Sequence, residues 1–292
     1  AHSARWQIDI DPLKTRAFEC ERVLRELQQR TPRRKIAFLL DEVDNLLRFD
    51  QHPENKETLF RTFRSLSNEQ RCQFVFSGEK WLMRAASDPY SALFNFAKGV
   101  RLEPLPPSVV KGLVADPFET LNIWIEGAEE VIGYIYNISA GHPNIVQMLC
   151  EAMIRELDRE GRNTNLVNLG HLDNALKNHQ LKQQIVETIW GQMTPLARLI
   201  TLVWPDGERF QTLDDLEKLL RDQGVSGVPP ELMRRTALDL ELYCFVRPQS
   251  QGKLELIPME FPTILSMLMD KTRQIKIDRD KYLANPEDMA VV

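Results

Sequence analysis

Apolar residues recur along this chain at two different spacings. Between residues 13 and 30, and again between 57 and 66, they lie three or four positions apart, which predicts amphipathic helices. Segments 36–40 and 72–78 are instead short and mainly apolar, as in strands of a parallel sheet that are covered on both faces. Because helices and short apolar strands alternate, the sequence predicts a parallel sheet with crossover helices.

Two acidic residues directly follow the first predicted strand. The run 35–44 reads Lys-Ile-Ala-Phe-Leu-Leu-Asp-Glu-Val-Asp. In α/β folds, ligands lie beyond the carboxyl ends of the strands. A carboxylate there can hold the Mg²⁺ of a nucleotide, directly or through water, and a second one can orient an attacking water as a general base. We assign the first role to Asp41 and the second to Glu42. The alternative is a solvated acidic turn after a buried strand.

Helical spacing returns after residue 128. Two predicted helices, 128–138 and 144–157, are separated by Ser-Ala-Gly-His-Pro at 139–143. Gly141 permits a positive φ and Pro143 cannot continue a preceding helix, so this segment predicts a sharp helix-to-helix corner. An ordinary corner without further role is the alternative. A polar connector is expected at 161–169, before a polar helix that ends near residue 190.

The last third has the element order of a winged helix-turn-helix domain. Helices are expected at 195–203, 213–222 and 230–242, the second of them capped by Thr212. A hairpin of two short strands follows at 243–257, and a closing helix extends to residue 269. Acidic residues outnumber basic ones between 190 and 270, whereas a DNA-binding face needs a basic footprint. A protein-facing role is therefore favoured over DNA binding. Residues 270–279 mix both charges and predict a solvated end.

The order of these elements resembles the second half of an AAA+ ATPase core, most closely that of the STAND signal-transduction ATPases and of the archaeal and bacterial ATPases close to them. The matching features are a strand ending in Asp-Glu, a helix, a strand ending in Ser-Gly, and the segment Val-Arg-Leu-Glu-Pro-Leu-Pro-Pro at 100–107. The resemblance implies that Asp41 and Glu42 form the Walker B motif. It also implies that Ser77 occupies the sensor-1 position facing the γ-phosphate, and that 100–102 is the last strand of the core sheet.

The resemblance covers roughly residues 13 to 270. It implies an α/β P-loop NTPase (AAA+-like) core fragment, an α-helical lid and a winged helix-turn-helix domain. In the lid, Gly141, His142 and Pro143 would lie over the base and sugar of a bound nucleotide. The expected bounds are 1–104 for the core fragment, 105–190 for the lid, 191–270 for the winged helix and 271–292 for a tail or linker.

One motif of these ATPases does not occur in this sequence, namely the phosphate loop G-x-x-x-x-G-K-[ST]. We expect the chain to be the part of an ATPase that follows this loop, and inactive by itself. A degenerate member that does not hydrolyse nucleotide is the less favoured account. Lys98, Arg101 and Arg84 lie near the place of an arginine finger, but a solvated surface charge explains each of them more readily.

The implied function is an ATP/ADP-dependent molecular switch with Mg²⁺, acting in signalling or defence. Its partners would be other protein domains or subunits in a nucleotide-gated oligomer. A DNA-binding AAA+ regulator and a non-catalytic interaction scaffold are the alternatives. The net charge of −5, four widely separated cysteines, and the lack of a membrane-length apolar run or opening signal peptide predict a cytoplasmic protein without membrane contacts. The histidines show no ligand spacing, so no zinc site is expected.

Overall fold

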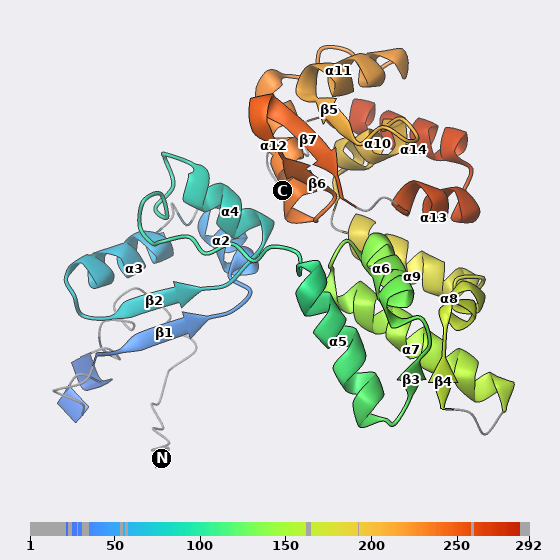
Figure 1. Cartoon of the computed structure of the whole chain (residues 1–292). Coiled ribbons are helices and arrows are strands. Elements are labelled where there is room, and N and C mark those ends of the chain that lie inside the picture. The colour runs from blue at the N-terminus through green and yellow to red at the C-terminus, as the bar shows by residue number, and fades with distance from the viewer. Residues whose placement is uncertain are drawn as a thin grey trace. The chain divides into compact units, whose positions relative to one another are not determined.

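The computed structural model divides the chain into two compact units, Ala1–Arg101 and Leu102–Val292. Each unit has its own hydrophobic core. The helices and strands of each unit are labelled in Figure 1. The helix predicted at 13–30 falls mostly outside the described residues, although those of its residues that are described are helical. The structure describes residues 22, 25–27, 29–30, 35–52, 55, 58–161, 165–191, 193–257 and 260–286.

The first unit is built on a parallel pair of strands. Its elements in chain order are β1 (Ala37–Leu40), α2 (Asp44–Asp50), α3 (Thr58–Asn68), β2 (Gln73–Phe76) and α4 (Lys80–Ser87). In the β1–β2 ladder, Ala37 lies opposite Gln73 and Leu40 lies opposite Phe76. The two predicted strands, their parallel pairing and the helix predicted between them are therefore confirmed.

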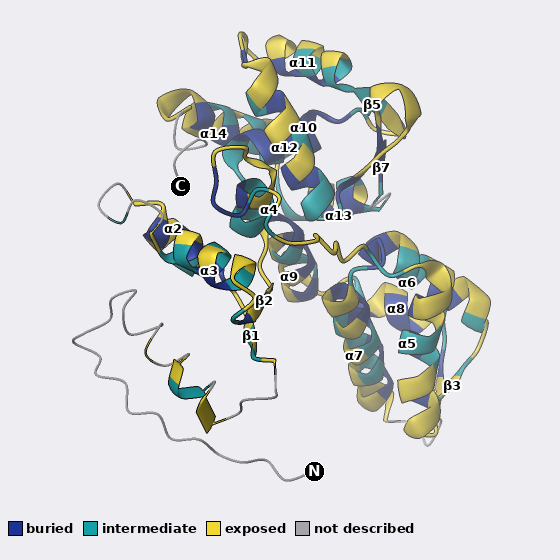
Figure 2. Cartoon of the chain, turned by 90° about the vertical axis from the view of Figure 1, so that its left-hand side faces the viewer, coloured by how far each residue is buried: buried dark blue, intermediate teal, exposed yellow. Residues whose placement is uncertain are grey.

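One face of this sheet is covered by α3, and the other face is open. The ring of Phe63 on α3 stacks on Phe74 of β2, with 4.6 Å between the ring centroids. Helices α2 and α3 accordingly have buried and exposed residues on different sides (Figure 2). On the opposite face, Leu39 is 79% exposed and Val75 is 54% exposed. The prediction of strands covered on both faces is wrong, because no element of the described chain packs over this second face.

The strand predicted at 100–102 is also not formed. Residues 97–106 have no helical or strand structure, and Val100 is 81% exposed. A strand is stabilised by backbone hydrogen bonds to a neighbouring strand. In the described part of the first unit the sheet consists of β1 and β2, and neither pairs with this segment. The alternating sequence at 100–102 therefore has no partner strand.

The second unit begins with a helical part. Its elements are α5 (Pro107–Thr120), β3 (Trp124–Ile125), α6 (Ala128–Ser139), α7 (Pro143–Glu160), β4 (Leu166–Val167), α8 (Leu169–Ala175) and α9 (His179–Trp190). Helices α6 and α7 confirm the two predicted lid helices. The segment predicted as a connector contains β4, which pairs in parallel with β3. Two helices, α8 and α9, occupy the region where one polar helix was predicted.

The rest of the second unit combines helices with a three-stranded antiparallel sheet. Its elements are α10 (Pro195–Val203), β5 (Phe210–Thr212), α11 (Leu213–Asp222), α12 (Pro230–Leu242), β6 (Val246–Pro248), β7 (Lys253–Leu256), α13 (Phe261–Leu268) and α14 (Lys271–Ala284). The predicted cap of α11 is confirmed: the Thr212 hydroxyl accepts a hydrogen bond from the Asp215 backbone N–H at 3.2 Å. The sheet order is β5-β7-β6, so the predicted hairpin forms and gains a third strand.

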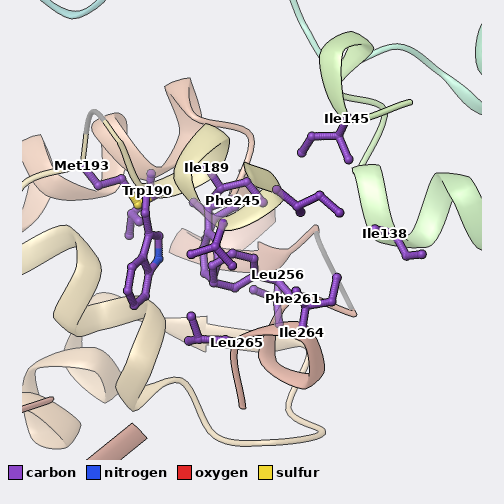
Figure 3. Packing of buried hydrophobic residues seen from close by; sticks show 14 of the residues in the cluster. Ile138, Ile145, Ile189, Trp190, Met193, Phe245, Leu256, Phe261, Ile264 and Leu265 are labelled. Carbon is purple, nitrogen blue, oxygen red and sulfur yellow. The ribbon is translucent and has the colours of Figure 1, made fainter. Parts of the chain in front are cut away.

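A single hydrophobic core extends through the second unit. It includes Ile138 and Ile145 from the lid helices together with residues of α9 and α13, some of which are seen in Figure 3. Phe261 of α13 links α9 to the segment before β6, because its ring centroid lies 6.0 Å from that of Trp190 and 5.4 Å from that of Phe245. The segments expected as a lid and as a C-terminal domain therefore share one core.

Helix α14 corrects the expectation of a tail from residue 271. It packs closely against α10, and its side chains Asp278 and Tyr282 are buried. The segment was predicted as a solvated end because its charges obscure a narrow buried stripe of residues three or four positions apart. In the described chain, no helix combines the length and the apolar character that crossing a membrane requires.

Candidate functional site

Asp41 and Ser77 meet at the carboxyl ends of β1 and β2. The ladder continues one residue beyond the strands, since the Ser77 backbone N–H donates to the Leu40 carbonyl oxygen at 2.9 Å. The Ser77 hydroxyl donates a hydrogen bond to Asp41 Oδ1. The sequence reasoning had assigned these two residues to one ligand site, and the parallel register brings them into direct contact. Both side chains are exposed in the first unit.

Glu42 has an unusual backbone. Its φ is +52°, in the left-handed region that non-glycine residues rarely adopt. Its backbone N–H donates to Asp41 Oδ1 at 3.1 Å, so the same carboxylate oxygen holds both Ser77 and this turn. Such a conformation costs about 1–3 kcal/mol and tends to occur at functional sites. The Glu42 side chain is exposed.

Asp44 is a structural member of the site that the sequence analysis missed. Its carboxylate accepts backbone N–H groups at the start of α4, from Glu79 at 2.6 Å and from Trp81 at 2.7 Å. A Cβ at residue 78 would lie closer than 3.0 Å to Asp44 Oδ2, so a larger residue here would displace this carboxylate. Asp44 thereby fixes α4 relative to the end of β1. Two sequence features could have indicated this role: Asp44 is the third acidic residue of the Asp-Glu-Val-Asp run, and Gly78 follows Ser77.

The corner between α6 and α7 is built around Gly141. Its φ is +79°, and its carbonyl oxygen accepts the Leu105 backbone N–H at 3.0 Å. A Cβ on Gly141 would come closer than 3.0 Å to the Leu105 carbonyl oxygen. The corner is therefore joined, within the second unit, to the Pro-rich segment that precedes α5. Glycine is required here both by the backbone angle and by this close approach.

His142 and Pro143 complete the corner. Pro143 is the first residue of α7, where its missing N–H costs no hydrogen bond. His142 Nδ1 is buried and finds no hydrogen-bond partner among the described residues. Burial lowers the pKa of His142 below its ordinary value, so the imidazole is neutral near pH 7. A neutral ring can offer one nitrogen as donor or acceptor to a ligand group.

The side chains at the strand ends could hold a metal ion only if a nucleotide supplied further ligands. No cluster of three or more His, Cys, Asp or Glu side chains with metal-binding geometry exists among the residues the structure describes. Mg²⁺ in nucleotide sites is normally held by one or two carboxylates, several waters and the substrate phosphates. Asp41 supplies such a carboxylate, because only its Oδ1 is engaged by Ser77 and Glu42. The three corner residues Gly141 to Pro143 belong to the second unit and Asp41 to the first.

One candidate for an arginine finger makes a local contact. The Arg84 guanidinium lies over the Trp81 ring, with its central carbon 5.8 Å from the ring centroid, and Arg84 is half-buried on α4. Such a cation–π contact contributes roughly 0.5–2 kcal/mol, more where the pair is less exposed to water. Lys98 and Arg101 lie in the irregular segment before α5.

Comparison with known proteins shows the fold of the chain. No protein-family model matches the sequence, and no curated protein matches it. Among solved structures, a Walker-type ATPase of Pyrococcus abyssi is similar with a TM-score of 0.57 and 16% identity, over 88% of this chain and 70% of that one. The ORC2 protein of Aeropyrum pernix, in complexes with ADPNP and ADP, is similar with a TM-score of 0.51 and 14% identity, over 95% of this chain and 72% of that one. The chain therefore has an α/β, AAA+-like fold of the P-loop ATPase kind, with additional helices.

Proposed function

We propose that this chain is the Walker B, lid and C-terminal part of a nucleotide-dependent AAA+-type ATPase. The observation that carries the proposal is the contact of Asp41 with Ser77 at the carboxyl ends of two parallel strands. Ligands of open α/β sheets bind at this edge. The fold shared with a Walker-type ATPase and with a nucleotide-bound ORC2 protein supports the same reading.

The site residues take the roles that their chemistry allows. Asp41 would hold Mg²⁺ through water, and Glu42 would orient the attacking water as a general base. The Ser77 hydroxyl, now bound to Asp41, is positioned to turn toward the γ-phosphate. In the second unit, Gly141, His142 and Pro143 form the surface for the base and sugar. Bound Mg²⁺ would neutralise charge on the transferred phosphoryl group.

The phosphate-binding loop comes from outside these residues. Three observations support an incomplete sheet. The motif does not occur in the sequence, and among the described residues of the first unit nothing covers Leu39 and Val75 and no strand pairs with Val100. A covering helix and a further strand would bury these apolar groups. The residues present would then form one side of the nucleotide site, and the chain alone would hydrolyse ATP slowly or not at all.

More specifically, we propose that the protein is a STAND-type switch in signalling or defence. ADP would hold the core and the second unit together, and ATP with an input signal would release them for contact with other domains or subunits. Such a shift requires that the γ-phosphate bind one of the two states more tightly than the other. Asp41, Glu42 and Ser77 are the described groups that would make this difference.

Nucleotide release from the native gene product tests the proposal. The product is heat-denatured and the released nucleotide is identified by chromatography, with this 292-residue chain treated in the same way. ATP or ADP from the native product supports the switch. If neither form releases nucleotide or takes it up on titration, the proposal fails and a non-catalytic interaction scaffold replaces it.

A substitution then tests the role of Glu42. In the native product, Glu42→Gln should bind ATP but hydrolyse it at least about 100-fold more slowly, since general acid–base catalysis typically contributes that much. Glu69→Gln is the matched control, because Glu69 lies at the far end of α3 and pairs with Arg71. Unchanged hydrolysis in Glu42→Gln would remove Glu42 from the mechanism.

We also propose that residues 191–270 form a winged-helix domain that contacts protein rather than DNA. The helix that would enter a DNA groove is α12, and its basic residues Arg234 and Arg235 each lie 3.4 Å from Glu231 on the same helix. These pairs reduce the positive charge that phosphate contacts require. We expect only weak duplex binding at about 0.15 M salt. A strong affinity that falls steeply with salt, and is lost in Arg234→Ala, would establish the DNA-binding alternative.

A further inference from the structure

The second unit has an apolar and acidic surface that the proposed nucleotide site does not use. In the β3–β4 pair, Trp124 lies opposite Leu166. Trp124 is 74% exposed and Leu166 is 40% exposed. Tryptophan is on average one of the more buried residues, and exposed apolar residues that lie together mark interaction sites. We call Trp124, Leu166 and Glu126 the Trp124 surface.

The two-residue period of the strands explains why these side chains share a face. Val167 is fully buried and Ile125 packs against the core, so residues one position away point outward. Two residues after Trp124, Glu126 lies on the same outer face. Its carboxylate Oε2 accepts a hydrogen bond from the Asn168 side-chain amide at 3.2 Å. Asn168 is itself fixed as the cap of α8. The Glu126 carboxylate is therefore held beside the apolar pair.

The surroundings of the Trp124 surface are acidic. Every charged residue between 119 and 130 is a glutamate, and all of them are exposed. Each basic residue on the neighbouring helices α5 and α7 pairs with a glutamate: Lys111 with Glu129, Arg155 with Glu151 and Arg159 with Glu156. Such a field repels nucleic acid phosphates and anionic lipids, and it attracts cationic groups. Charge therefore indicates what kind of molecule this surface binds.

We propose that the Trp124 surface binds a basic segment of another protein. An arginine or lysine side chain of that segment lies on the Trp124 indole, which attracts cations through its ring face. Its charged head group pairs with the Glu126 carboxylate. An adjacent apolar side chain of the partner contacts Leu166. Tryptophan at the centre of an interface commonly supplies much of the binding free energy. This inference does not depend on the nucleotide proposal.

Peptide binding to the complete chain tests this proposal. The probe is a short, fluorescently labelled synthetic peptide in which arginine and leucine alternate, and its affinity is measured by anisotropy. Trp124→Ala should weaken binding about tenfold or more, as for a central aromatic anchor. Glu126→Gln should weaken it less and reduce its salt dependence. Leu283→Ala is the matched control, because Leu283 is an exposed apolar residue on α14, and it should leave the affinity unchanged.

Several outcomes overturn the proposal. Affinity that is equal in the parent chain and in Trp124→Ala, with circular dichroism showing both folded, would place the peptide elsewhere. Equal binding of a peptide with glutamate in place of arginine would remove the charge argument. Concentration-dependent self-association that is lost in Trp124→Ala would assign the surface to a second copy of this chain instead.

Discussion

The corner at Gly141 allows a quantitative test of how the second unit is held together. Replacing Gly141 by alanine places a Cβ on a residue with φ of +79° and against the Leu105 carbonyl oxygen. The backbone strain costs about 1–2 kcal/mol. Pushing the Leu105 backbone away adds about 1–3 kcal/mol, as for other overpacked sites. We therefore expect Gly141→Ala to reduce the free energy of unfolding by about 2–5 kcal/mol.

Gly161→Ala is the matched control, because Gly161 also has a positive φ, +59°, and ends α7, but a Cβ there would meet nothing within 4 Å. It should cost only the backbone strain. Urea unfolding followed by circular dichroism gives both free energies from the midpoint and slope. If the two substitutions cost the same within about 0.5 kcal/mol, the size of a typical surface effect, the contact with Leu105 does not stabilise the corner.

Three further predictions concern single side chains. Burial lowers the pKa of His142, so the free energy of unfolding should fall as pH drops below the ordinary histidine pKa of 6.5. A pH series of urea midpoints should show a smaller fall in His142→Gln. Burial raises the pKa of Cys150 to about 12, so this thiol should resist alkylation at pH 8 until the chain is unfolded, as mass spectrometry would show, whereas rapid labelling of the folded chain would contradict it. Thr212→Ala removes the cap of α11 and should cost about 1 kcal/mol of unfolding free energy, with Thr212→Ser restoring most of it.

Sequence reasoning succeeded where the signal was local. Helices α10, α11 and α12 begin with proline or with a capping threonine, and their predicted bounds match the structure. The parallel pairing of the two strands also followed from sequence, and it brings Asp41 and Ser77, which the family resemblance assigned to one site, to the same edge of the sheet. The catalytic and nucleotide-binding roles assigned to these residues, and to Gly141, His142 and Pro143, stay predictions.

Sequence reasoning failed where the structure depends on distant partners. The strands β3 and β4 have two residues each, too few to show an alternation of apolar and polar residues. Each of them is a strand only because it pairs with the other. The segment at 100–102 shows the opposite case, in which a strand-like pattern has no neighbour to pair with. Asp44 was missed because its ligands, the backbone N–H groups at the start of α4, are 35 or more residues away. Helix α14 was missed because charged residues surround its buried stripe.

The caps of the helices have a consequence for the order of folding. In the second unit, α9, α10, α11 and α14 each begin with a side-chain cap from the adjacent residue, so each start is specified locally. In the first unit, α4 is capped by Asp44, which precedes β2 in the chain whereas α4 follows it. Helix α3 is capped by Asp50, which accepts the Leu59 and Phe60 N–H groups. Local contacts form before contacts that close long loops. The four locally capped helices of the second unit can therefore form early, whereas α4 gains its cap only after β1 and β2 have paired.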